Sequence, residues 1–272
     1  MKTINIILFS ALLLITTSAT TSKKPRKYQK NRHVTYRVDQ SRDTYQIDYS
    51  FRDHFGGIWD VEISFDREMT DDLIGDFGIP AAMFKPYHLT PAVLQHRERV
   101  LQEGLFMVDG NKLRPDYRAL VKHYRNYVSP IADVIVEALR QTGQDTRHNR
   151  IEMAMKFVQD IPYAIPNNDT RRMYYGGMSP PPETLINGYG DCDSKAILFA
   201  CILSHLIDQD DVILLHQPGH MLTAIRGERF PGASHLSYQG DTFVLAETAG
   251  PGHANWGEVD STERSATIID IS

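Results

Sequence analysis

The stretch that follows Cys192 constrains the fold more than any other part of the chain. Apolar residues occupy most positions between 196 and 207, so a helix formed there presents hydrophobic side chains on most of its surface. Such a helix is stable only where other layers of the protein enclose it. Gly188 and Gly190 precede the cysteine and predict a loop that becomes this helix at Cys192. The chain therefore needs a fold with this helix near its centre.

Helical patterns also fill the region before this stretch. Residues 115–128 have apolar side chains at helical spacing, and Ser129 followed by Pro130 predicts the start of a second helix that ends at Gly143. A third helix is predicted from about residue 145 to the proline at position 162. Residues 162–190 are rich in turn formers and predict a long surface loop that leads to the cysteine.

Strand patterns lie on both sides of the helical region. Apolar and polar residues alternate in two runs separated by Gly56 and Gly57, which predicts a β-hairpin. Residues between this hairpin and position 110 show no period that assigns them to an element. The predicted strands are 45–51, 59–65, 212–215, 221–225, 242–246 and, more weakly, 266–271.

The N-terminus has the order of a secretory signal. Lys2 precedes an apolar run at 6–15, and small and polar residues follow up to position 19. The run is well short of the roughly 20 residues that cross a bilayer, so we expect a secreted or periplasmic protein that does not span the membrane in its mature form. The expected organisation is a signal peptide (1–19), a basic disordered linker (20–32), an N-terminal β-rich region (33–110) and a catalytic domain (111–272).

The charge distribution argues against a nucleic acid partner. The formal net charge is −5, whereas nucleic-acid-binding domains are usually basic. The exception is the segment 23–32, which has no apolar period and is predicted to be a solvated spacer. An alternative is that it docks an anionic component of the cell envelope. Its basic residues are Lys23, Lys24, Arg26, Lys27, Lys30 and Arg32.

The chain has only two cysteines, Cys192 and Cys201. On one helix, nine residues place them roughly 13 Å apart along the axis and on opposite sides, whereas a disulfide needs α-carbons within about 7 Å. We therefore expect no disulfide between them. Cys201, within the apolar stretch, is predicted to be a core residue.

Cys192 is the candidate nucleophile. At a helix start, free N–H groups and the helix dipole stabilise a thiolate, although Asp191 and Asp193 beside it oppose a further negative charge. A cationic partner is therefore required. His220 opens a predicted strand, and Glu247 follows the strand 242–246, where a carboxylate could orient the imidazole. Nucleophile, base and orienting acid thus occur in that order.

The sequence gives less support to a metal site or to a different catalytic histidine. His216 and His220 are four residues apart, but Pro218 and Gly219 between them prevent a helix that would direct both imidazoles at one zinc ion. The acidic residues lack the alternating spacing of a calcium loop. We therefore expect no metal and no cofactor. His253 remains an alternative to His220, although it lies in a predicted turn.

Three motifs in the same order resemble the transglutaminase-like (papain-like) superfamily: GDCDSKA at 190–196, PGHMLTAI at 218–225 and VLAETAGPG at 244–252. The resemblance covers roughly residues 150–258. It implies an α+β fold in which the helix with the cysteine packs on an antiparallel β-sheet, preceded by the β-hairpin region and helices. Adjacent strands of that sheet would bring the histidine and the acid to the cysteine.

The resemblance also implies roles for individual residues. Cys192, His220 and Glu247 would be catalytic, with Tyr189, Gly190 and Trp256 at the substrate. Most members have aspartate where this chain has Glu247, which is one methylene longer, so Asp241 and Asp260 remain fallback acids.

The resemblance implies an activity as well. Bacterial members are commonly exported peptidases or amidases, whereas animal relatives join glutamine and lysine side chains. We therefore expect an exported cysteine hydrolase that acts on a protein or peptide through a thioester on Cys192. The alternatives are a protein-glutamine transglutaminase, in which an amine replaces water, and a catalytically inactive envelope binding module.

Overall fold

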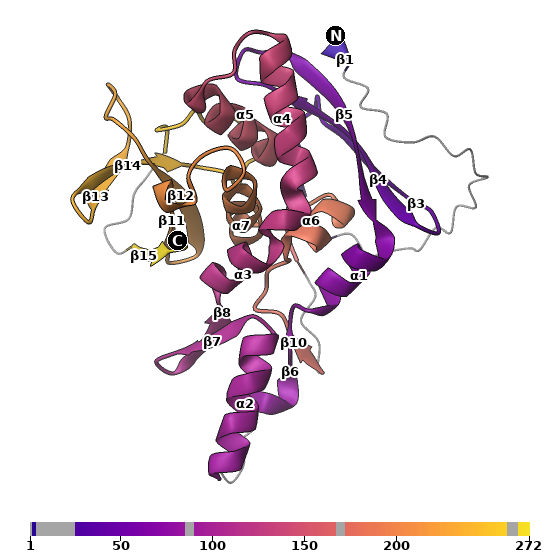
Figure 1. The fold of residues 1–272 in the computed structure, drawn as a ribbon, viewed down its shortest axis with the longest axis vertical. Coiled ribbons are helices and arrows are strands. Elements are labelled where there is room, and N and C mark those ends of the chain that lie inside the picture. The colour runs from indigo at the N-terminus through magenta and orange to yellow at the C-terminus, as the bar shows by residue number, and fades with distance from the viewer. Residues whose placement is uncertain (1, 4–24, 85–89, 167–171, 260–265) are drawn as a thin grey trace.

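A computed structural model describes residues 2–3, 25–84, 90–166, 172–259 and 266–272 (Figure 1). The predicted signal peptide lies outside the described residues except for Lys2–Thr3 (β1), which pairs with a strand of the first sheet. Among the described residues, the structure contains no helix with the length and apolar character needed to cross a membrane.

Two β-sheets lie on opposite sides of a layer of helices (Figure 1). The first sheet has the order β1-β5-β4-β3 and the second has the order β13-β14-β12-β11-β15. Neighbouring strands are antiparallel except for β1 and β5. This arrangement confirms the predicted α+β class. The strands are β3 (Thr35–Gln40), β4 (Thr44–Arg52), β5 (Ile58–Asp66), β11 (Val212–Gln217), β12 (His220–Arg226), β13 (His235–Tyr238), β14 (Asp241–Ala246) and β15 (Thr267–Asp270).

The helix that begins at Cys192 lies in the middle layer. Every residue from Ser194 to Leu203 is buried, because this helix packs on β11 and β12 and on the other helices of its layer. Its predicted central position and its packing on an antiparallel sheet are therefore confirmed. The helices of this layer are α3 (Tyr117–Tyr124), α4 (Ser129–Gln141), α5 (Arg147–Asp160), α6 (Pro181–Asn187) and α7 (Cys192–Leu203), with 3-10 turns at Arg125–Val128 and Gln209–Asp211.

The predicted hairpin is confirmed, and its register explains the alternation in the sequence. Ile47 lies opposite Ile63, and Phe51 lies opposite Trp59, so the apolar side chains of both strands share one face. That face packs against the helical layer, where the hydroxyl of Tyr49 donates to the carbonyl of Phe157 at 2.6 Å. One hydrophobic cluster includes side chains from both predicted regions, 33–110 and 111–272.

Two stretches fold differently from the prediction. Arg26–Gln29 forms a strand, β2, which pairs with β9 (Tyr163–Ile165), so the linker is not disordered there. Its side chains are exposed, and main-chain pairing needs no apolar period. The predicted loop 162–190 contains β9, β10 (Met173–Tyr174) and α6, because prolines are tolerated in the first helical turn, where N–H groups have no partner.

Between the hairpin and residue 117, the described residues 67–84 and 90–116 also contain regular elements. Asp66 and Thr90 accept hydrogen bonds from N–H groups in the first turns of two helices and so cap them. The second of these helices projects from one end of the molecule beside short strands (Figure 1). The elements are α1 (Arg67–Gly75), β6 (Ile79–Pro80), the 3-10 turn Ala81–Phe84, α2 (Pro91–Glu103), β7 (Phe106–Asp109) and β8 (Lys112–Pro115).

Candidate active site

His220 and Glu247 meet at one end of the second sheet. His220 opens β12, Glu247 follows β14, and these two strands are antiparallel neighbours. The imidazole Nε2 and the carboxylate Oε2 are 2.7 Å apart, and Oε1 accepts a hydrogen bond from the N–H of Ala249 at 2.7 Å. The hydrogen bond with Glu247 raises the pKa of His220, although burial acts in the opposite direction. The carboxylate therefore stabilises the imidazolium once the ring has taken up a proton, while the neutral ring can still act as a base.

Cys192 is the first residue of α7, and its helix start is firmly capped. The Asp191 carboxylate accepts hydrogen bonds from the N–H and the hydroxyl of Ser194, at 3.0 and 2.6 Å. Burial raises the pKa of Asp191 to about 6, with a contribution from Asp193, while the bonds from Ser194 lower it. The cap holds the backbone of the cysteine in a defined place.

The thiol of Cys192 lies beside β12. The main-chain N–H of Met221, the residue that follows His220, lowers the pKa of this thiol. Its Sγ also donates to Oδ1 of Asp193 at 3.4 Å. The start of α7, with Cys192, therefore packs beside β12, the strand on which His220 pairs with Glu247.

The protonation state of Cys192 differs from the expectation. Burial raises the pKa of the thiol above its usual range, and the charges of Asp193 and Asp191 raise it further, while the N–H of Met221 lowers it. These effects outweigh the stabilisation expected at a helix start. The resting cysteine is thus a neutral thiol that needs a base.

Two tyrosines contribute to the site although no motif pointed to them. Tyr163 forms a parallel bridge with Gly190, and its pKa is raised mainly by burial. Tyr117 donates its hydroxyl to Oδ2 of Asp193 at 3.3 Å. Both lie far from the cysteine in sequence, so only the packing of β9 and α3 beside α7 reveals them.

A buried lysine ties the cysteine helix to the loop after Glu247. Lys195 is fully buried, and its ammonium donates to the carbonyls of Gln159, Ile161 and Ala249 at 3.2, 2.8 and 2.6 Å. Burial lowers the pKa of Lys195 to about 7. The side-chain amide of Gln159 donates to the carbonyl of Glu247 at 2.6 Å. The end of α5 thus positions the loop that carries the acid.

The three residues expected at the substrate, Tyr189, Gly190 and Trp256, differ from one another in burial and contacts. Gly190 exchanges hydrogen bonds with the backbone of 162–164, and a Cβ there would lie 3.0 Å from the Thr184 side chain, so close packing accounts for this glycine. Tyr189 is half-buried. Trp256 is buried, with its ring nitrogen donating to the carbonyl of Val244 at 3.2 Å.

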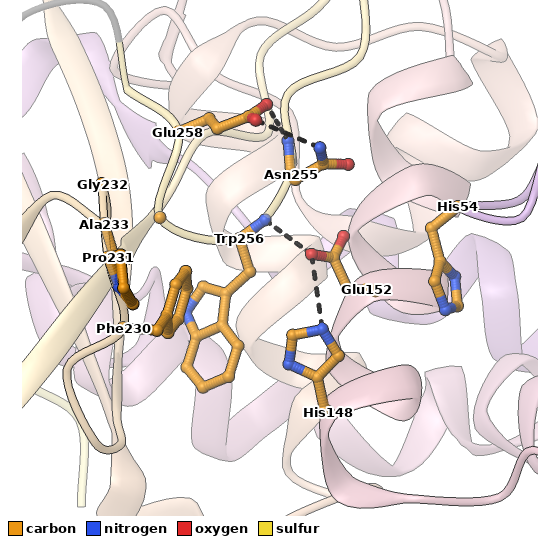
Figure 2. Close-up of a pocket in the computed structure, with 11 residues that line it drawn as sticks. His54, His148, Glu152, Phe230, Pro231, Gly232, Ala233, Asn255, Trp256 and Glu258 are labelled. Atoms are coloured by element: carbon orange, nitrogen blue, oxygen red, sulfur yellow. Dashed lines mark hydrogen bonds and ion pairs between the residues drawn. The ribbon is translucent and has the colours of Figure 1, made fainter.

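Trp256 lines a cavity of about 460 Å³ (Figure 2). Its main-chain N–H donates to Oε1 of Glu152 at 2.8 Å, and its ring lies beside that of His148. Cys192, His220 and Glu247 are absent from the described residues that line it. The cavity is lined by His54, His148, Glu152, Phe230, Pro231, Gly232, Ala233, Asn255, Trp256, Gly257 and Glu258.

The alternative residues take other partners. Asp241 pairs with Arg226 at 3.0 Å, and His253 pairs with Asp160 at 2.9 Å. His216 is exposed on β11, and Asp260 lies outside the described residues. Cys201 is buried in α7, as predicted for a core residue, and both thiols are free.

Comparison with known proteins adds no relative. The chain matches no family model, no curated protein and no solved structure.

Proposed function

We propose that this protein is an exported cysteine hydrolase, a peptidase or amidase, with a transglutaminase-like (papain-like) catalytic core. The observation that carries the proposal is the pair of His220 and Glu247, next to the main-chain N–H of Met221, which lowers the pKa of the Cys192 thiol. The packing of α7 on the antiparallel strands β11 and β12 supports the fold. Export rests on the signal-like N-terminus.

The first step forms a thioester. Because Glu247 occupies Nε2 of His220, Nδ1 is the nitrogen that accepts the thiol proton. The thiol leaves its contact with Asp193, and the sulfur attacks the amide carbonyl carbon while His220 takes the proton. The C–N bond then breaks, and His220 returns the proton to the leaving amine. Glu247 stabilises the imidazolium between these transfers.

The helix start supplies the groups that stabilise negative charge on the carbonyl oxygen. The Ser194 N–H is used by the Asp191 cap, which leaves the N–H groups of Cys192 and Asp193 at the first turn. In the second step, water attacks the thioester carbon and gives its proton to His220. The C–S bond breaks, a carboxylic acid leaves, and the cysteine regains its proton.

Thiol labelling tests this chemistry. In a Cys201→Ser background, we expect iodoacetamide to alkylate Cys192 at neutral pH, and His220→Ala to slow the reaction by roughly tenfold. The matched control is His96→Ala, since His96 is exposed on α2. If the His220 and His96 variants react at the same rate as the parent, the nucleophile and base assignments are wrong.

The acceptor that resolves the thioester needs its own assay. Casein incubated with a fluorescent primary amine reports hydrolysis as fragments and transamidation as incorporated label. We expect fragments that disappear with Cys192→Ala. Label without fragments would instead support a protein-glutamine transglutaminase.

One observation favours an inactive envelope binding module. The thiol of Cys192 donates to Asp193, and the same carboxylate raises its pKa. A module of this kind would show neither alkylation dependent on His220 nor turnover of casein. The labelling experiment therefore separates it from the hydrolase.

A further inference from the structure

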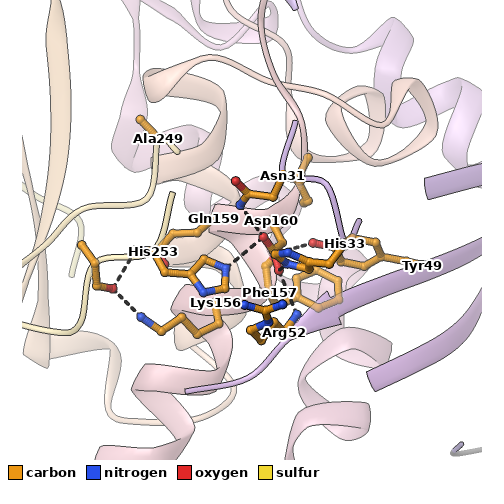
Figure 3. A network of polar contacts seen from close by, with 12 residues as sticks. Asn31, His33, Tyr49, Arg52, Lys156, Phe157, Gln159, Asp160, Ala249 and His253 are labelled. Atoms are coloured by element: carbon orange, nitrogen blue, oxygen red, sulfur yellow. Dashed lines mark hydrogen bonds and ion pairs between the residues drawn. The ribbon is translucent and has the colours of Figure 1, made fainter. Parts of the chain in front are cut away.

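Two histidines from distant parts of the chain converge on one buried aspartate (Figure 3). His33 follows β2, Asp160 ends α5, and His253 lies in the loop after Glu247. The Nε2 atoms of His33 and His253 lie 2.7 and 2.9 Å from the two carboxylate oxygens. One ligand atom from each residue lies within 4.8 Å of the others, the only such group among the described residues.

The carboxylate of Asp160 is held from its other side. Oδ1 accepts from the amide of Asn31 at 2.7 Å, and Oδ2 accepts from the main-chain N–H of Arg52 at 2.8 Å. Each oxygen has two lone pairs, so these donors use one on each and orient the group. The remaining lone pair on each oxygen faces an imidazole. This is how outer hydrogen bonds orient a metal-binding carboxylate.

The access and ligand chemistry suit a metal ion. The Asp160 side chain is fully buried, whereas those of His33 and His253 are 19% and 22% exposed, so an ion can enter between the imidazoles. Zinc binds imidazole nitrogen and carboxylate oxygen at about 2.0 to 2.2 Å. The three side chains need only small shifts to reach such distances, with positions left for water.

We propose that His33, Asp160 and His253 bind a single divalent transition-metal ion of the Zn²⁺ type. Each neutral imidazole would coordinate through Nε2 and carry its one proton on Nδ1, whereas an imidazolium would first release one proton to solvent. The ion would join the segment after β2 to the loop that follows Glu247. This site is independent of the proposed acyl transfer.

The charged side chains near Asp160 set the affinity that we expect for the metal ion. Lys156 and Lys195 interact electrostatically with Asp160, and their positive charges oppose a second cation. We therefore expect micromolar rather than nanomolar affinity. The sequence did not indicate this site, because its ligands come from three separated stretches without a local motif.

Calorimetric titration with Zn²⁺ alone tests the site. The protein should carry Cys192→Ala, so that the thiol cannot bind the ion, and the visible spectrum with Co²⁺ should report ligand type. We expect binding of a single ion, with His33→Gln and His253→Gln each weakening it by at least roughly tenfold. His235→Gln is the control, since His235 is exposed and its imidazole bonds the carbonyl of Ala233, far from Asp160 in the sequence.

A second experiment tests whether the ion links the segment after β2 to the loop after Glu247. Zn²⁺ should raise the unfolding temperature and slow tryptic cleavage near Lys30 and Arg32, because the ion ties this segment to the loop. Circular dichroism confirms that each variant is folded. No saturable binding below millimolar Zn²⁺, or equal affinity in the His33, His253 and His235 variants, would overturn the proposal.

Discussion

The imidazole of His220 and the carboxylate of Glu247 form an ion pair, with Nε2 and Oε2 2.7 Å apart. The pair exists because β12 and β14 are antiparallel neighbours, so the start of one lies beside the end of the other. Glu247 therefore reaches the histidine from the end of the neighbouring strand.

Replacing Glu247 with glutamine should lower the pKa of His220. The hydrogen bond with this carboxylate is the main cause that raises it. NMR titration of the imidazole measures the pKa, and we expect amidase activity to fall by roughly 100-fold. Glu258→Gln is the control, because Glu258 bonds Asn255 instead. An unchanged pKa of His220 would contradict the orienting role.

Replacing Asp193 with asparagine should lower the pKa of the Cys192 thiol. Burial is the largest cause of its raised pKa, and the charge of Asp193 is the next. Removing this charge shifts the alkylation profile towards lower pH, with roughly tenfold faster labelling at neutral pH. Asp133→Asn, at an exposed position of α4, should leave the profile unchanged. Identical alkylation profiles for Asp193→Asn and Asp133→Asn would contradict this effect of Asp193 on the thiol.

Replacing Lys195 with methionine should destabilise the fold. Three carbonyls would lose their donor, at a cost of about 3 kcal/mol measured by chemical denaturation. Lys122→Met, at an exposed position of α3, should change stability little. An equal loss in both would show that the buried ammonium is dispensable.

Lys195 should also give the wild type a specific pH dependence. Its folded pKa of about 7 is below the ordinary lysine value of 10.5, so between these values the unfolded chain binds a proton that the folded chain does not. Unfolding free energy should rise with pH across this window. The rise should be absent in Lys195→Met.

Replacing Asp160 with asparagine should remove a contribution to stability that is present at neutral pH and lost in acid. Burial alone would raise the pKa of Asp160, but hydrogen bonds from His253, Arg52, Asn31 and His33 lower it from 3.8 to about 2. The carboxylate then stabilises the fold by about 2 kcal/mol above pH 4, and this is lost as the pH falls towards 2.

Acid denaturation followed by circular dichroism measures this effect. The difference between wild type and Asp160→Asn should be largest above pH 4 and shrink below it. Asp72→Asn, at an exposed position of α1, is the control. A difference that does not change with pH would contradict the assignment.

Two glycine substitutions separate backbone strain from steric contact. Gly188 and Gly143 have φ of +66° and +68°, but only at Gly188 would a Cβ meet a neighbour, the Tyr36 ring at 2.7 Å. Gly143→Ala should cost about 1 kcal/mol, and Gly188→Ala about 2 kcal/mol or more. Thermal or urea unfolding measures both. Equal losses would show that the ring moves away freely.

Local periodicity was sufficient to predict a helix or strand where one physical effect dominated. The alternation at 45–51 and 59–65 predicted β4 and β5, and the apolar stretch after Cys192 predicted α7. It was insufficient for α6, because its prolines favour turns and also suit a first helical turn. It also missed β2, whose exposed side chains carry no pattern.

The sequence by itself determined the order of Cys192, His220 and Glu247 and the elements that begin or end at them, because caps, glycines and periodicity act over a few residues. Only the tertiary structure decided their environment. Burial beside Asp193 makes the thiol neutral at rest, and the end of α5 holds Lys195 and Asp160 under the loop after Glu247. Desolvation and contacts between distant segments arise only when the layers pack, so no local pattern encodes them.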